Sequence, residues 1–124
     1  MSILAQTTPT ALADKLVTVL TVNTIAKNNV TGSTSGIIYM IEVDNGNNEL
    51  DDLYLKIADA SSATVGTTQP KMCFRIPKQT KVVFAISNGF AYSAGISMWA
   101  TKNPAYTDST VPDSGLDVQL LATA

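Results

Sequence analysis

The chain of 124 residues contains no histidine and a single cysteine. Without histidine, catalytic triads that need it, His-ligated zinc and acid–base catalysis by imidazole are excluded. Cys73 has no partner for a disulfide within the chain and no histidine to activate its thiol, so we expect a small residue of the core or of a sheet. These absences predict a protein that is not an enzyme and uses no cofactor.

Charge is also scarce, because charged residues make up 15% of the chain and the formal net charge is -2. A nucleic-acid partner would need clustered lysines and arginines with aromatic residues between them, and the sequence has no such cluster. Residues 1–15 lack a basic segment and an unbroken apolar run. We therefore expect no signal peptide and no membrane contact, and synthesis in the cytoplasm.

The composition is rich in Thr, Ser, Asn and Ala, which suits strands and turns. The clearest stretch, Gly36–Asp59, predicts two strands joined by a polar turn. Both faces of the first strand are largely apolar, with Ile38 and Met40 on the same face. The second strand alternates, which places Lys56 on a wet face. Asn and Gly residues at 45–48 allow the chain to reverse, so we expect a β-hairpin.

Similar short alternating runs recur along the chain. We expect strands at residues 14–22, 37–43, 53–57, 71–76, 80–86, 96–101 and 116–120, with a further short strand at 24–27. The strand at 80–86 continues at 90–93 after a turn at 87–89. About seven or eight strands indicate an all-β fold, an antiparallel β-sandwich of the jelly-roll or immunoglobulin-like kind. Residues 13–124 form this single domain. Residues 1–12 are an extended N-terminal arm, which either orders against a neighbouring subunit or is a disordered tail.

Two strands carry apolar residues on both faces, although a sandwich needs only one apolar face. They are the strand with Ile38 and Met40 and the strand at 82–86. The second face is covered either by a neighbouring subunit or by the arm or a long loop of the same chain. Acidic residues crowd 42–59 and basic residues crowd 71–81; these are either solvated strand ends or complementary contacts between copies.

Two features suggest a ligand. The run 44–49 is rich in oxygen ligands, but its glycine is the third residue and not the sixth as in a calcium-binding EF-hand loop, so we expect a turn and no metal. Trp99 has Tyr92 and Tyr106 nearby in the sequence. These aromatic residues form either a sugar-stacking platform or part of the core or of a subunit contact.

Five short motifs follow one another between residue 53 and the C-terminal end. They are Tyr54-Leu55-Lys56, Val65-Gly66-Thr67 with Pro70, Ile76-Pro77, the run from Asn88-Gly89-Phe90 to Gly95-Ile96-Ser97, and Asp108-Ser109-Thr110 with Pro112. In this order they resemble the pattern of small β-sandwich virion proteins of tailed bacteriophages, of the capsid decoration, or cement, type. The strand at 72–75 is more basic than that pattern, and residues 1–12 have no counterpart in it.

The resemblance implies a bacteriophage structural protein that binds the major capsid protein on the surface of the virion and stabilises the head, as a homo-oligomer, a trimer. The residues that we expect to contact a partner are Ile3, Leu4, Ile38, Met40, Trp99 and Tyr106. The alternative is a phage tail or fibre component that binds host-surface glycan through Trp99 and Tyr106. The copy number per particle separates the two.

Overall fold

The computed structural model describes residue 13 and residues 15–123. These residues form β1 (Lys15–Val22), β2 (Gly36–Asp44), β3 (Leu53–Asp59), β4 (Met72–Ile76), β5 (Lys81–Tyr92), β6 (Ile96–Thr101) and β7 (Leu116–Thr123). No helix occurs in this part of the chain, so none there is long and apolar enough to cross a membrane. The all-β prediction is confirmed.

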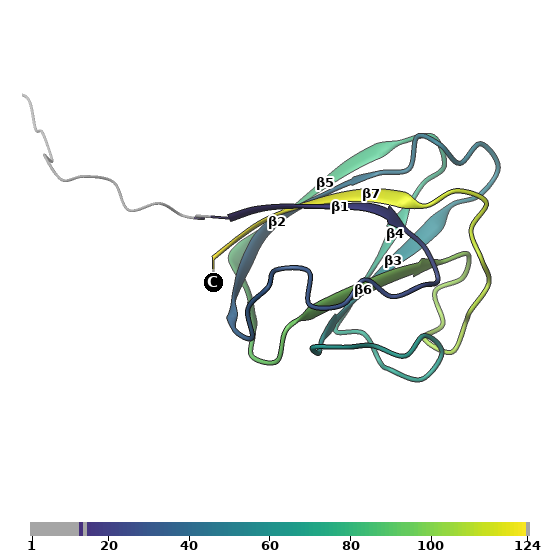
Figure 1. Ribbon diagram of the computed structural model, residues 1–124. Helices are drawn as coiled ribbons and strands as arrows, with labels where there is room; N and C mark the ends of the chain where they lie inside the picture. The colour runs from purple at the N-terminus through teal and green to yellow at the C-terminus, as the bar shows by residue number, and fades with distance from the viewer. Residues whose placement is uncertain (1–12, 14, 124) are drawn as a thin grey trace, which may run out of the picture.

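The strands form two antiparallel sheets that pack face to face (Figure 1). The large sheet has the order β1-β7-β2-β5, and the small sheet has the order β4-β3-β6. In Figure 1 the large sheet lies above the small one. The predicted antiparallel β-sandwich is therefore confirmed.

The segment between β1 and β2 closes one edge of the small sheet. Lys27 forms an antiparallel bridge with Met98 of β6, and Ala100 N donates to Asn23 O at 2.9 Å. The short strand expected at 24–27 is thus an isolated bridge. When this segment is counted as a strand beside β6, the order of both sheets is that of an eight-stranded jelly roll. An immunoglobulin-like sandwich would instead place the first strand beside the second.

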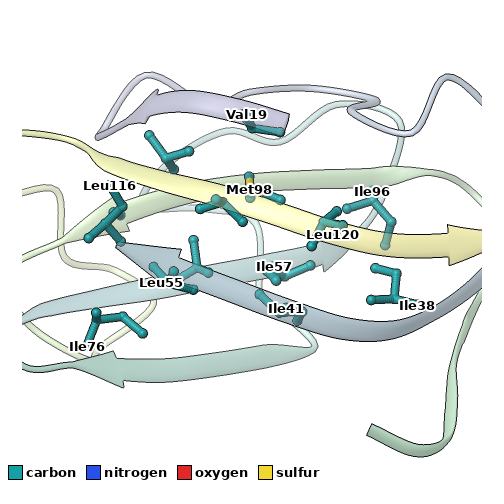
Figure 2. Packing of buried hydrophobic residues seen from close by; sticks show 14 of the residues in the cluster. Val19, Ile38, Ile41, Leu55, Ile57, Ile76, Ile96, Met98, Leu116 and Leu120 are labelled. Carbon is teal, nitrogen blue, oxygen red and sulfur yellow. The ribbon is translucent and has the colours of Figure 1, made fainter. Parts of the chain in front are cut away.

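The core lies between the two sheets and takes alternate residues from each strand. In β7, Leu116, Val118, Leu120 and Ala122 are fully buried, whereas the residues between them are half-buried. Figure 2 shows side chains of both sheets meeting in this layer, among them Leu120 from β7 and Ile57 from β3. Burial of each large apolar side chain contributes about 1.5–3 kcal/mol relative to exposure.

A bulge in the large sheet changes which residues of β2 face the core. Between Ile38 and Met40 the register shifts against both neighbouring strands, and β5 accommodates the shift with positive φ angles at Asn88 and Gly89. The turn expected at 87–89 is therefore a bulge inside β5. As a consequence, Ile38 is fully buried in the core and Met40 is half-buried on the outer face, so the prediction that they share a face is wrong.

The predicted hairpin of Gly36–Asp59 is also wrong. β2 pairs with β5 and β7, and β3 pairs with β4 and β6, so the two strands lie in opposite sheets. The side chain of Asn45 is buried and donates to Ile76 O at 3.0 Å, and Asn48 Nδ2 donates to Asn45 Oδ1 at 2.7 Å. These asparagines satisfy buried polar groups at the end of the sandwich, where the chain crosses from one sheet to the other.

Candidate functional site

The outer face of the large sheet carries an apolar row that crosses all four strands. The antiparallel register aligns Leu16 of β1, Leu121 of β7, Met40 of β2 and Ala85 of β5. Leu16 is 62% exposed, Ala85 is also exposed, and the other two are half-buried. We call these four residues the apolar row. A partner that covered it would remove this apolar surface from water.

Toward the other end of this face the side chains become polar. The next row contains Thr18, Gln119, Glu42 and Val83, and the row after it contains Asp117, Asp44 and Lys81. Asp44 and Asp117 lie directly opposite each other, an arrangement that destabilises a sheet when nothing compensates. Gly46 N donates to Asp44 Oδ1 at 2.7 Å, and Thr21 N donates to Asp117 Oδ1 at 3.1 Å. These bonds hold both carboxylates at the acidic end of the face.

The positively charged side chain of Lys81 lies among these carboxylates. Lys81 Nζ is 3.1 Å from Glu42 Oε1, and this hydrogen bond and the attraction between the charges raise the pKa of Lys81. Both residues, with Asp44 and Asp117, line a shallow pocket of about 220 Å³. The outer face therefore has the apolar row at one end and a mainly acidic group at the other, where the exposed Leu20 lines the same pocket.

The outer face of the small sheet is covered by the chain itself. Lys56 Nζ donates to Thr101 Oγ1 at 2.7 Å and to Ala105 O at 2.6 Å, which ties residues 102–112 over this face. We call residues 102–112 the roof. Lys56 is fully buried beneath it, so the wet face predicted for this strand is wrong. Burial lowers the pKa of Lys56, because it disfavours the charged amine.

Trp99 lies opposite Lys56 on β6 and is fully buried. Among the described residues its indole Nε1 has no hydrogen-bond partner. Tyr92 is also buried, and its hydroxyl donates to Thr31 Oγ1 at 2.9 Å. Tyr106 is 40% exposed on the roof. The three aromatic residues therefore do not form one exposed platform, because a buried ring cannot stack on a sugar.

Four of the predicted partner-contact residues offer no described surface. Ile3 and Leu4, like the whole arm predicted at 1–12, lie outside the described residues. Ile38 and Trp99 are fully buried, Ile38 in the core between the sheets and Trp99 opposite Lys56 on the small sheet. A contact between a partner and either of these two would require the chain to open.

The other two predicted residues reach the surface on opposite sheets. Met40 belongs to the apolar row, and Tyr106 lies on the roof. Leu16 and Leu121, which complete the row beside Met40, were not singled out from the sequence. The available signal was the alternation in their strands, since Leu121 lies between the core residues Leu120 and Ala122, and Leu16 precedes Val17, which packs against the core.

Charged groups of the described chain pair with one another near the acidic and basic stretches. Arg75 Nη2 lies 2.7 Å from Asp52 Oδ2, and Lys102 Nζ lies 3.4 Å from Asp51 Oδ2. The pKa of Asp52 is lowered by a hydrogen bond from the backbone N–H of Lys78 and by Arg75. These internal pairs favour the interpretation of solvated strand ends over that of contacts between copies.

Cys73 lies on the edge strand β4 and is exposed, so it is a sheet residue but not a core residue. The run 44–49 belongs to the connection between the sheets described above. Over residues 13 and 15–123, no group of three or more Cys, Asp or Glu is placed to hold a metal ion. Neither Cys73 nor the run 44–49 belongs to a set of metal ligands in the described chain.

Comparisons of the chain with protein families, with curated proteins and with solved structures gave no match. What the structure shows is the class of fold and one surface. The fold is a jelly-roll β-sandwich, and the outer face of its large sheet is apolar at one end and mainly acidic at the other.

Proposed function

We propose that this protein is a non-enzymatic structural protein of a tailed-bacteriophage virion, a decoration (cement) protein that binds the major capsid protein on the head surface. The observation that carries the proposal is the apolar row, which the described chain leaves uncovered. A shell protein that fully buried Leu16 would gain at most about 1.5–3 kcal/mol from it, and less from Met40 and Leu121, which are already half-buried. The acidic end of the same face would set the orientation of docking.

The fold adds support by analogy. Jelly rolls recur in viral capsid proteins, although a fold alone does not specify a function. The order of motifs from Tyr54 to Pro112 resembles the decoration proteins independently of the strand order. The resemblance also implies a homo-oligomer, a trimer, and several linked copies would bind a shell more tightly than one.

The proposed mechanism is stabilisation by binding. The protein would bind the assembled shell and not its free subunits, so the free energy of binding would add to the stability of the assembled state. Heads that lack the protein should therefore release their genome at a lower temperature than complete heads. Adding the purified protein back should restore the original temperature, and equal heat resistance of the two kinds of head would refute the proposal.

A matched pair of variants locates the binding face. Leu16 is 62% exposed on the apolar row, and Val111 is 63% exposed on the roof. Leu16→Glu should lose binding to heads and lose heat protection, because it places a charge within the buried contact. Val111→Glu should retain both. Equal binding by the two variants would show that another surface contacts the shell.

The second candidate is a tail or fibre component that binds host-surface glycan. The observation in its favour is the exposed Tyr106 on a fold that also occurs in lectins. Densitometry of purified particles separates the candidates, since decoration requires hundreds of copies per particle and a tail protein far fewer. Tyr106→Ala should leave binding to heads unchanged if the chain is a decoration protein.

A further inference from the structure

We infer that this protein pairs with a second copy of itself through the edge of β5, in an antiparallel arrangement about a two-fold axis. Among the described residues, β5 pairs with β2 on one side and with no strand on the other. This inference goes beyond the proposed virion role and does not depend on it, and its two-fold pair takes the place of the trimer that the resemblance implies.

The backbone groups at this edge can be assigned from the register. Asn45 N donates to Thr80 O at 2.8 Å, so these residues form a hydrogen-bonded pair between β2 and β5. The register then runs without interruption through Lys81, Val83 and Ala85. Since alternate residues of an antiparallel strand bond to its partner, the N–H and C=O groups of these three residues point away from β2. They form the hydrogen-bonding edge.

The edge has few of the features that usually prevent pairing. Natural edge strands are protected by charges, prolines or bulges. From Val82 to Tyr92 the strand contains no charged residue and no proline, and Val83 is 54% exposed. The bulge at 86–89 interrupts only the second half. The stretch 81–85 is therefore a regular, nearly uncharged edge rich in residues that favour strands.

The core is also less well covered on this flank. Phe74 of β4 packs on Phe84 of β5 across the two sheets, with ring centroids 4.4 Å apart. Both rings belong to the apolar interior, yet both are only half-buried. On the opposite flank, β6 is closed by hydrogen bonds to the segment around Lys27. A second copy beside β5 would give the open flank comparable cover.

The edge is complementary to itself. A two-fold axis at Val83 places Val83 opposite its counterpart and Lys81 opposite Ala85 of the second copy. Each outward N–H then meets an outward carbonyl, and the two Val83 side chains lie side by side. Each lysine lies opposite a small apolar residue, so no like charges oppose each other. The two four-stranded sheets become one continuous sheet.

The first measurement is the mass of the full chain in solution by sedimentation equilibrium, where we expect twice 13.1 kDa. Val83→Lys and Val83→Glu should each lose the dimer, because the axis places two like charges directly opposite. Mixing these two variants should restore a dimer that contains one copy of each. Val83→Thr keeps the branched shape and the charge state, and should remain dimeric.

A second variant tests the backbone bonds. Ala85→Pro removes an N–H that points away from β2, which an edge strand tolerates, and should yield a folded monomer by circular dichroism and mass. If this variant does not fold, the mixture of charged variants decides alone. A single-chain mass at all concentrations, a trimer, or a mixture that stays monomeric would overturn the inference. A trimer that protects heads would leave the proposed function intact, whereas a β5 dimer that does not bind heads would refute only that function.

Discussion

The described chain covers the outer face of the small sheet and leaves the outer face of the large sheet exposed. On the small sheet, Lys56 and Trp99 are fully buried, and Lys56 donates to Ala105 O of the roof, 49 residues away in the sequence. On the large sheet, Leu16 is 62% exposed and Met40 is half-buried. A polar residue is thus hidden and apolar residues are displayed. The difference shows that the described chain covers the outer face of the small sheet and leaves that of the large sheet open.

The largest expected effect comes from deleting a side chain under the roof. Trp99→Ala should lower the free energy of unfolding by about 3–5 kcal/mol, because it removes a fully buried ring and leaves a cavity. Leu16→Ala, on the uncovered face, should change it by about 0.5 kcal/mol or less in the isolated chain. Denaturant unfolding of both variants measures this contrast. Similar losses would mean that the two faces are equally covered.

The next effect is a dependence on pH. The pKa of Lys56 in the folded protein lies below its ordinary value of 10.5, so between these values the unfolded chain binds more protons. The stability therefore rises as the pH rises through this window. Lys56→Met should abolish this rise, which unfolding curves recorded between neutral pH and pH 10.5 would detect. If the free energy of unfolding changed with pH in the same way in Lys56→Met and in the wild type, the amine of Lys56 would not be buried as described.

Lys81 on the uncovered face supplies the control of opposite sign. Its pKa is raised by Glu42, so its contribution is complete below the ordinary value of 10.5 and is lost as the pH rises through the folded value. Lys81→Met should therefore remove a small fall in stability at high pH. If Lys81→Met instead removed an increase in stability with pH, the pKa of Lys81 would be lowered and not raised.

The smallest expected effect concerns the order of the roof. Asp108 Oδ2 accepts from Thr110 Oγ1 at 2.6 Å and from Asn103 N at 3.2 Å. Burial alone would raise the pKa of Asp108, but these hydrogen bonds lower it. Asp108→Ala should loosen the roof and shift the emission of Trp99, the single tryptophan, to longer wavelength. Asp44→Ala, on the other sheet, should leave the emission unchanged; equal spectra for wild type and both variants would contradict this role.

The positions of the strands could be predicted from the sequence, because alternation is a local property. β3, β4, β6 and β7 begin within a residue or two of the predicted runs. The pairing of strands could not, since Asn45 looks like a turn residue and nothing local shows that it bonds to Ile76. The burial of Lys56 could not be predicted either, because its acceptor, Ala105 O, is 49 residues away in the sequence.

The candidate site was only partly predictable. Met40 was expected at a partner contact, but its separation from Ile38 depends on a bulge that requires β5 and β7 to be in place. The importance of Leu16 rests on the absence of cover over its face within the described chain. Such a property depends on where the long loops go, and alternation within one strand contains no information about that.

The position of β7 has a consequence for how the protein is made. It is the last of the described strands, yet it lies between β1 and β2 in the large sheet. Among the described strands β1 pairs with β7 alone, so until β7 has been synthesised β1 has no neighbour with which to bond. Val19 and Val22, which are buried in the folded protein, then remain in water. Pairing of such distant segments is slow and leaves unfolded intermediates prone to aggregation. A nascent chain of this protein should therefore aggregate more readily before β7 has been synthesised than after.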